Sequence, residues 1–320
     1  MKRNLVEIAF EITYLCNLRC THCYNKEFVK KPQPEMSTEQ IFKALKKIRD
    51  FGAYKLKIGG GEPFMRKDFF DVYDYSVSLG YETNFSSNGL IVKKNIENML
   101  ERNIDKIQIS LDNIGEKHDK FRNFEGLFEI VKGSISELNK NGIKINIATT
   151  LTKDNYNDLE QILDFCRDND IFRWKIMKYI PDSCSDKLLL SKEDYKEAVL
   201  RLLDYKEECD ISPEIIVARE FDMIKVPCDY NDMQCFGGKS FLSLKPNGDV
   251  TPCSYTYDIV CGNITEDSVE DIWNSEKMLE FSKDYYDCEC QYADKCKGGC
   301  KAVSHFMKKE FDCDPYCWVK

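Results

Sequence analysis

Three cysteines near the amino terminus have the spacing of a metal-binding loop. Cys16, Cys20 and Cys23 form a C-x3-C-x2-C run directly after a strand-like segment. Three thiolates on one loop can hold a [4Fe–4S] cube, which normally takes four cysteines, so one iron keeps an open position where a reactant can bind. The spacing alone also allows a zinc site completed from outside, with His22 as the nearest candidate, or three unrelated thiols.

A second, denser group of cysteines occupies the carboxyl-terminal part of the chain. Ten of the sixteen cysteines lie from Cys228 onward, including the closely spaced Cys288 and Cys290. In a secreted chain this density would indicate disulfides, whereas in a reducing compartment it indicates metal binding or redox chemistry. We therefore expect a second metal region here. The short C-x-C spacing leaves a zinc ribbon open as an alternative.

The composition limits the class of protein and its partners. The chain has 320 residues with a net charge of −9, and 42% of its residues are hydrophobic. That length suggests one large domain with a smaller one appended, and the apolar content allows a sizeable core. The negative charge argues against a nucleic-acid partner, because phosphate binding needs an excess of lysine and arginine. No signal peptide and no apolar run near ~18 residues is present, so we expect a cytoplasmic protein without a membrane partner.

The segments that must position the first three cysteines alternate between strand-like and helix-like patterns. Short stretches rich in β-branched or aromatic residues predict strands at 7–13, 55–59, 82–86, 106–111, 144–150 and 173–180. Apolar residues at helical spacing predict helices at 38–51, 68–78, 93–101, 125–141 and 155–169. This alternation favours parallel βα units in an open sheet or a partial barrel, with the chemistry at the carboxyl ends of the strands.

Small and polar residues follow three of these strands at that same edge. Gly59-Gly60-Gly61-Glu62-Pro63 follows the second strand, Ser86-Ser87-Asn88-Gly89 the third, and Ser110-Leu111-Asp112 the fourth. Glycines let the backbone approach a ligand closely, and unpaired backbone groups there can bind an amino group. The serines suit hydroxyl or carboxylate groups of a ligand. Each segment has an ordinary alternative as a turn or a helix cap.

Taken together, these motifs resemble the radical S-adenosylmethionine (SAM) superfamily. The resemblance rests on the cysteine run with Tyr24, the Gly-Gly-Glu-Pro turn, and Ser110-Leu111-Asp112 followed by His118, Asp119 and Arg122, and it covers most of residues 6–180. It implies an α/β fold, a partial (β/α)6 barrel, with a [4Fe–4S] cluster and SAM at its top. The implied SAM contacts are Tyr24 at the adenine, Gly60, Gly61 and Glu62 at the amino group, and Ser86, Ser110 and Arg122 at ribose or carboxylate.

The resemblance also implies the chemistry. A cluster reduced below roughly −400 mV donates an electron to the SAM sulfonium and leaves a 5′-deoxyadenosyl radical, which takes hydrogen from an unactivated C–H bond. Cys16, Cys20 and Cys23 are then the catalytic ligands. A low-potential donor of the flavodoxin or ferredoxin type is implied as the electron source.

The carboxyl-terminal cysteines resemble the SPASM domain, a smaller α+β iron–sulfur extension of radical SAM enzymes. One residue instead of two separates Cys288 from Cys290, which departs from the family pattern. The resemblance implies two auxiliary [4Fe–4S] clusters, and so three clusters in all. The first would take Cys228, Cys235, Cys253 and Cys300. The second would take four of Cys288, Cys290, Cys296, Cys313 and Cys317, with Cys317 favoured over Cys313.

The expected organisation has three parts. Residues 1–180 form the radical SAM core, 181–227 a bridging region with a helix at 192–208, and 228–320 the SPASM domain. The last part is expected to hold a β-hairpin of strands 241–244 and 250–253 and a helix at 269–281. Of the remaining cysteines, Cys166 is expected in the core, and Cys184 is a candidate hydrogen-atom donor to a product radical.

Three functions remain open from the sequence. SPASM-containing enzymes commonly modify peptides, so the first hypothesis is oxidative modification of a ribosomally made peptide, such as a crosslink, an epimerisation or a side-chain oxidation. Because the first strand begins by residue 6, we expect either a separate leader-binding protein or a substrate without a leader. The second hypothesis is a small-molecule substrate such as a tetrapyrrole. The third is a non-catalytic iron–sulfur or zinc protein.

Overall fold

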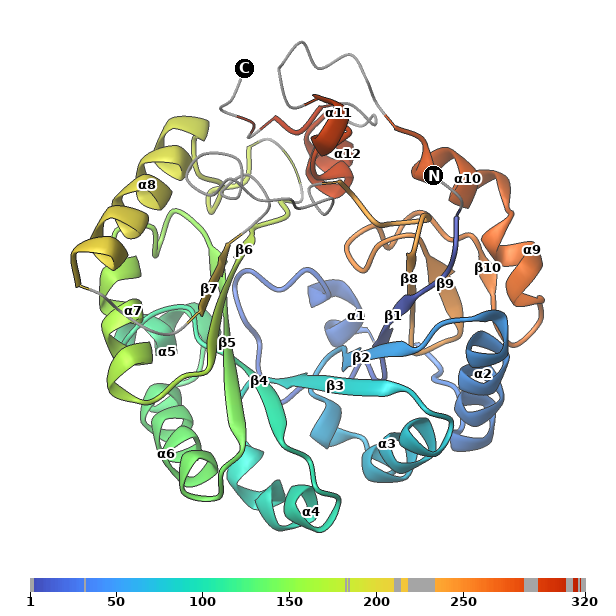
Figure 1. Cartoon of the computed structure of the whole chain (residues 1–320), viewed down its shortest axis with the longest axis horizontal. Coiled ribbons are helices and arrows are strands. Elements are labelled where there is room, and N and C mark those ends of the chain that lie inside the picture. Colours follow the sequence, from blue (N-terminus) through green and yellow to red (C-terminus); the bar gives the residue numbers. More distant parts are fainter. Residues whose placement is uncertain are drawn as a thin grey trace.

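The fold is built on a sheet of mainly parallel strands that curves into an arc (Figure 1). The computed structural model describes residues 3–31, 33–181, 183, 185–209, 214–217, 234–284, 293–308, 313–315 and 317. Within these residues the strand order is β10-β9-β8-β1-β2-β3-β4-β5-β6-β7. Neighbours from β8 through β1 to β7 are parallel, whereas β9 and β10 are antiparallel to their neighbours. The predicted α/β partial barrel is confirmed.

The strands alternate with helices that cover the outer side of the arc (Figure 1). The strands are β1 (Glu7–Glu11), β2 (Lys55–Gly59), β3 (Glu82–Ser87), β4 (Lys106–Ser110), β5 (Lys144–Leu151), β6 (Arg173–Lys178), β7 (Glu214–Val217), β8 (Phe241–Leu244), β9 (Asp249–Thr251) and β10 (Gly262–Asn263). The helices of the first part are α1 (Lys26–Lys30), α2 (Thr38–Phe51), α3 (Phe69–Ser78), α4 (Ile96–Glu101), α5 (Glu116–Arg122), α6 (Leu127–Lys140), α7 (Leu159–Asp168) and α8 (Lys192–Cys209). The later helices are α9 (Val269–Trp273), α10 (Glu276–Ser282), α11 (Ala293–Cys296) and α12 (Lys301–Lys308), and 3-10 turns span Pro63–Met65 and Val92–Asn95.

Residue alternation along the strands separates a dry outer face from a polar inner face. In β4, Ile107 and Ile109 are fully buried beneath the helices, whereas Gln108 and Ser110 are half-buried on the other face. Successive strand residues point to opposite faces, so the second set faces the inside of the arc. The barrel lumen is therefore lined by polar side chains, and the apolar core lies between the sheet and the helices.

Helix α2 shows how the local sequence determines where a helix begins. Ser37 caps α2 by accepting a hydrogen bond from the backbone N–H of Gln40, and the Gln40 side chain accepts one from the Ser37 N–H. This reciprocal pair satisfies two N–H groups that the first helical turn leaves without partners. The predicted bounds of this helix, 38–51, agree with the structure.

Several parts of the prediction differ in the structure, including the helix expected at 93–101, which is a 3-10 turn followed by α4. The helix expected at 269–281 is two short helices, α9 and α10, because Ser275 caps the start of α10 by accepting a hydrogen bond from the Met278 N–H. The bridging region contributes β7, which pairs in parallel with β6.

The carboxyl-terminal segment joins the barrel through the sheet. β8 pairs in parallel with β1, and the predicted hairpin continues outward as β8 and β9. In the view of Figure 1, α11 and α12 lie between the two ends of the arc. The segment that carries the later cysteines is thus attached to the same sheet as the first cysteine loop. The domain bounds at 180 and 228 stay a prediction.

Candidate active site

The loop that carries the first cysteines leaves the carboxyl end of β1 and is held by one carboxylate. Glu35 accepts hydrogen bonds from the Thr13 hydroxyl at 2.8 Å and from the Tyr14 N–H at 2.7 Å. The Arg66 guanidinium fixes the same carboxylate at 3.2 Å. These contacts set the direction in which the chain enters the cysteine loop. No motif pointed to Glu35, which lies in a proline-rich connection.

The three cysteine thiols face one cavity of about 320 Å³ at the top of the lumen. Burial is the main cause that raises the pKa of each thiol, to about 11 for Cys23, and the neighbouring cysteines raise it further at Cys20 and Cys23. Unligated thiols are therefore protonated at neutral pH, so binding a metal centre must release protons. Their closeness on one half-buried loop fits a multi-atom cluster. In the described part of the chain, no three cysteine, histidine or carboxylate side chains could hold a single metal ion.

The glycine turn after β2 packs directly against the cysteine loop. The Gly61 N–H donates to Thr13 O and the Glu62 N–H to Leu15 O, both at 2.8 Å. A Cβ atom on Gly61 would lie 2.1 Å from Leu15 O, so only glycine allows this approach. Within the described residues, the carbonyl oxygens of Gly60 and Gly61 have no hydrogen-bond partner. Acceptors of this kind suit the amino group of a ligand in the adjoining cavity.

The Glu62 side chain organises the next loop. It is fully buried and accepts hydrogen bonds from the Ser87 hydroxyl at 2.9 Å and the Asn88 N–H at 2.8 Å. Burial raises the pKa of Glu62 to about 7. The Glu62 N–H donates to Leu15 O and the Glu62 carbonyl accepts the Met65 N–H, so this residue shapes the site by holding the neighbouring segments in place.

Arg122 lies at the edge of the cysteine loop in a buried ion pair. Its guanidinium contacts Asp112 at 2.6 and 2.7 Å, and Nη1 lies 4.0 Å from Cys20 Sγ. Arg122 lowers the pKa of Asp112 against the opposing effect of burial. His118 supports the pair, because its Nδ1 accepts the Asp112 N–H at 3.2 Å. Burial lowers the pKa values of His22 and His118 to about 4, so both imidazoles are neutral.

Tyr24 lines the same cavity from the other side. Its hydroxyl lies 3.4 Å from Glu11 Oε1, and its ring meets the edge of the Tyr255 ring at a centroid distance of 4.9 Å. Glu11 is buried and forms an ion pair with Lys245, which also donates to Ser254 O. An aromatic wall thus joins β1 to the carboxyl-terminal segment. Tyr255, two residues after Cys253, was not predicted as part of the site.

Every strand from β1 to β6 contributes to the lining of this cavity. Ser86 and Ser110 lie on it as expected, as do Gly60, Gly61 and Arg122, whereas Glu62, which was also expected at the ligand, is not part of the lining. Met177 and Lys178 at the end of β6 line it as well, although no motif pointed to them. The cavity therefore runs from the cysteine loop into the barrel lumen.

The structure also brings together three of the later cysteines. Burial raises the pKa of Cys300 to about 12, and Asp314, Cys235 and Cys253 raise it further, so both other thiols lie within electrostatic range of Cys300. Cys228, Cys288 and Cys290 lie outside the described residues, as does Cys184. Cys296 lies in α11, and Cys317 carries a free thiol. Cys313 is buried and disulfide-bonded.

A buried ion pair links this later group to the active-site cavity. Lys178 donates to Asp314 Oδ2 at 2.6 Å, and the same oxygen accepts the Cys300 N–H at 3.1 Å. Both side chains are less than one-tenth exposed. The position of the Cys300 loop is therefore tied to β6, which carries Met177 in the cavity.

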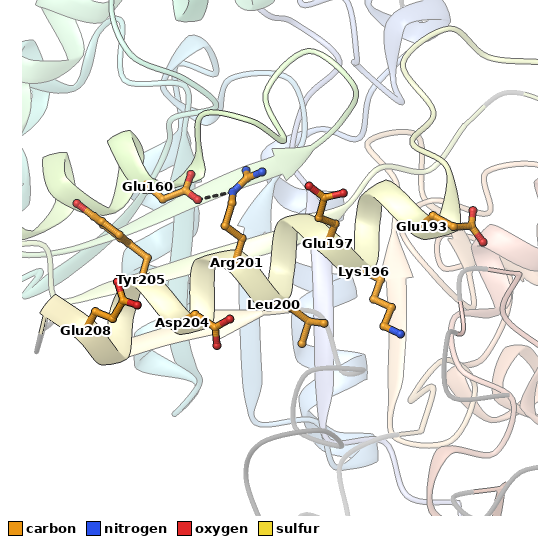
Figure 2. Close-up of a pocket in the computed structure, with 9 residues that line it drawn as sticks. All are labelled: Glu160, Glu193, Lys196, Glu197, Leu200, Arg201, Asp204, Tyr205 and Glu208. Carbon is orange, nitrogen blue, oxygen red and sulfur yellow. Dashed lines mark hydrogen bonds and ion pairs between the residues drawn. The ribbon is translucent and has the colours of Figure 1, made fainter.

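A larger depression lies on the outer surface and has no part in this site. It is about 620 Å³ and follows α8, with Glu160 and Arg201 paired at 2.5 Å (Figure 2). Its lining consists of charged side chains with Leu200 and Tyr205, and includes no cysteine. Cys166, on the neighbouring α7, is fully buried in the core as expected.

Comparison with known families decides the identity of the fold. Residues 10–166 match the family model of the radical SAM superfamily, and residues 235–301 match that of an iron–sulfur cluster-binding domain, SPASM. The chain belongs to the radical SAM superfamily. It is therefore an enzyme, and its family implies SAM and [4Fe–4S] clusters as cofactors.

Relatives and solved structures agree with this family but differ in substrate. An AdoMet-dependent heme synthase of Oleidesulfovibrio alaskensis is 28% identical, covering 94% of this chain and 83% of the relative. The sporulation killing factor maturation protein SkfB of Bacillus subtilis is 25% identical, covering 89% of this chain and 68% of SkfB. The structure of Streptococcus suis SuiB bound to its precursor peptide SuiA superposes with a TM-score of 0.78 at 18% identity, covering 99% of this chain and 75% of SuiB.

The residues of this radical SAM site fit the implied cofactors. The three thiols, the unpaired carbonyls of Gly60 and Gly61, and the serine hydroxyls of β3 and β4 surround one cavity. The buried His22 Nδ1 beside the cysteines also has no hydrogen-bond partner among the described residues. No helix in the described part of the chain has the length and apolarity needed to cross a membrane.

Proposed function

We propose that this enzyme abstracts a hydrogen atom from a ribosomally made peptide and so introduces an oxidative modification. The observation that carries the proposal is the continuity of the cavity, which runs from Cys16, Cys20 and Cys23 into the polar lumen. A substrate group inserted into the lumen would lie next to the cofactor. When bound, the cluster and SAM supply the 5′-deoxyadenosyl radical.

The dimensions of the cavity favour a substrate that inserts only part of itself. A volume of about 320 Å³ is near the lower end for ligand sites, and SAM must share it. A peptide can place one side chain inside while the rest stays outside. Support also comes from the names of similar proteins, since SkfB is a maturation protein and SuiB binds a precursor peptide.

The protein's own residues have three tasks in this proposal. Cys16, Cys20 and Cys23 ligate one cluster, and Gly60 and Gly61 accept from the amino group of SAM. Tyr24, Ser86, Ser110 and Arg122 position the rest of SAM, and Glu62 supports them by holding the Ser87 and Asn88 segment. The cavity walls exclude water from the reacting groups.

The later cysteines would hold two auxiliary clusters that move electrons. Cys235, Cys253, Cys300 and Cys228 form the first set. The second draws on four of the five remaining cysteines, Cys288, Cys290, Cys296 and Cys317, since Cys313 is disulfide-bonded. We further propose a separate leader-binding protein, a flavodoxin- or ferredoxin-type electron donor, and a cytoplasmic location, because free thiols and clusters need a reducing compartment.

A small anionic molecule such as a tetrapyrrole is the second candidate. The lower lumen carries Lys57, Lys106, Arg173 and Lys175, which favours a substrate with negative charges. The name of the heme synthase relative supports the same class.

The test is isotope transfer into 5′-deoxyadenosine. Reconstituted enzyme is incubated anaerobically with SAM, a strong reductant and a deuterated candidate, either a precursor peptide encoded beside the gene or an iron porphyrin with propionate side chains. We expect deuterium in 5′-deoxyadenosine with the peptide only. Transfer from the porphyrin alone would reject the peptide proposal in favour of the second candidate. Cys16→Ala is the matched control, in which no transfer should occur.

A further inference from the structure

A second cavity of about 300 Å³ lies in the lower lumen, at the amino ends of the strands. It shares Lys57, Ile58, Ser86 and Gln108 with the active-site cavity, so the two cavities adjoin along β2, β3 and β4. Its walls come from β2 to β6. The lower cavity therefore lies directly below the radical site in the lumen.

The lining of this lower cavity is strongly cationic. Four of its ten side chains are Lys57, Lys106, Arg173 and Lys175, and none is acidic. Lys57 is paired with Glu7 at 2.6 Å, and Arg173 with Glu214 at 2.5 Å. No carboxylate of the described residues pairs with Lys106.

Register places these charges around the same level of the lumen. Lys57 pairs with Asn84 across β2 and β3, and Asn146 pairs with Arg173 across β5 and β6. Lys106 lies two residues before Gln108, which pairs with Asn146. Side chains two residues apart on a strand share a face, so Lys106 points into the lumen with Gln108.

A buried amide beside these cations lacks a partner. Asn146 Oδ1 is inaccessible to water and has no hydrogen-bond partner among the described residues. An unsatisfied buried polar atom costs about 1–3 kcal/mol. Together with Gln108 and Asn84, this amide offers hydrogen-bonding groups of either kind, because an asparagine can present its oxygen or its NH2 group.

Stability does not explain this composition. Small barrels usually fill their interior with packed branched side chains, whereas here cations and amides surround open space. Glu7 and Glu214 each neutralise one of the four cations, whereas Lys106 has no carboxylate partner among the described residues, and its repulsion by the neighbouring cations is relieved when an anion binds. The arrangement therefore fits a site for negative groups.

We propose that the lower lumen is a carboxylate-binding subsite, in which Lys106, with Lys57, Arg173 and Lys175 around it, anchors an anionic end of the substrate below the radical. This inference rests on the proposed function, since it assumes that substrate occupies the lumen. The carboxylate can belong to an acidic peptide or to the propionates of a tetrapyrrole, and the test has an arm for each.

The test measures binding without turnover. Reconstituted enzyme with SAM and no reductant is titrated calorimetrically with acetylated pentaglutamate against acetylated pentaglutamine, and with coproporphyrin III against its tetra-amide. We expect a charged probe to bind more tightly than its neutral counterpart, and Lys106→Gln to weaken that binding on the order of tenfold, which corresponds to about 1.4 kcal/mol. Added salt should weaken it as well.

The matched control is Lys132→Gln, which removes one exposed lysine from the outer side of α6. It should leave both affinities unchanged, and circular dichroism confirms the fold of each variant. The proposal is wrong if neither charged probe binds, if charged and neutral probes bind alike, or if Lys106→Gln retains wild-type affinity. Because no SAM is cleaved in this assay, its outcome is independent of whether the proposed peptide chemistry occurs.

Discussion

Replacing Gly61 by alanine tests whether the glycine turn positions the cysteine loop. A Cβ atom at this position would lie 2.1 Å from Leu15 O, whereas ordinary contacts begin at 3.4 Å. The backbone of the Gly61 turn and that of the Leu15 segment must therefore move apart by roughly 1.3 Å, because a closely packed interior has no free space to take up the added atom. Overpacking of this kind costs about 1–3 kcal/mol. The hydrogen bonds to Thr13 O and Leu15 O weaken at the same time.

The shift is transmitted directly to the chemistry, because Leu15 precedes the ligand Cys16. A misplacement of about 1 Å can cost roughly 10²-fold in rate. We expect Gly61→Ala to lower the free energy of unfolding by about 2–4 kcal/mol in urea titrations, the overpacking cost plus about 1 kcal/mol for the strained hydrogen bonds. We also expect it to slow SAM cleavage by roughly 100-fold.

Gly133→Ala is the matched control for that variant. Gly133 lies within α6, and nothing lies within 4 Å of a Cβ atom placed there. Alanine in a helix interior is favoured over glycine by about 1 kcal/mol, so this variant should be slightly more stable and fully active. The steric account would be refuted if Gly61→Ala matched wild type in both stability and SAM cleavage.

Three further predictions concern the ion pair, the buried histidine and the auxiliary ligands. Asp112→Asn should lower the free energy of unfolding by about 3–5 kcal/mol, because it leaves the buried Arg122 uncompensated. The exposed pair of Lys46 and Asp50 provides the control Asp50→Asn, which should leave the stability nearly unchanged, and equal effects of the two substitutions would contradict the reasoning. Burial lowers the pKa of His118 to about 4, so the stability that its neutral form contributes is complete above about pH 6.5 and is lost as the pH falls toward 4. His118→Asn should reduce this loss of stability in urea titrations from pH 7 to 4, and a pH profile equal to that of wild type would contradict the prediction. Cys317→Ala should lower the iron content per chain in anaerobically reconstituted protein, whereas the core variant Cys166→Ala should not. If both variants held the same amount of iron per chain, Cys317 would not be a cluster ligand.

Local patterns in the sequence predicted most of the barrel. Strand alternation and helical periodicity depend on neighbours a few residues away, which is why α2 was predicted at its observed bounds. The cysteine spacing and the glycine turn also act locally, and both lie at the cavity. The break between α9 and α10 was missed, although Ser275 offered a cap signal within the apolar pattern.

Contacts between distant segments could not be predicted in the same way. The pairing of β8 with β1 and the ion pair of Glu11 with Lys245 join residues more than 230 positions apart. Neither partner has a local pattern that specifies the other, because the pairing depends on how the barrel edge is completed. The cationic lower lumen was missed for the same reason, since its charges come singly from separate strands.

Iron content and SAM cleavage in a cysteine variant test the central claim most directly. Wild-type protein and Cys16→Ala/Cys20→Ala/Cys23→Ala, reconstituted anaerobically, are compared for iron per chain and for 5′-deoxyadenosine formed with a strong reductant. The structure predicts that the variant loses one cluster's share of iron, keeps the iron of the later cysteines, and forms no 5′-deoxyadenosine. Cleavage of SAM by the variant at the wild-type rate would contradict the assignment of these three thiols.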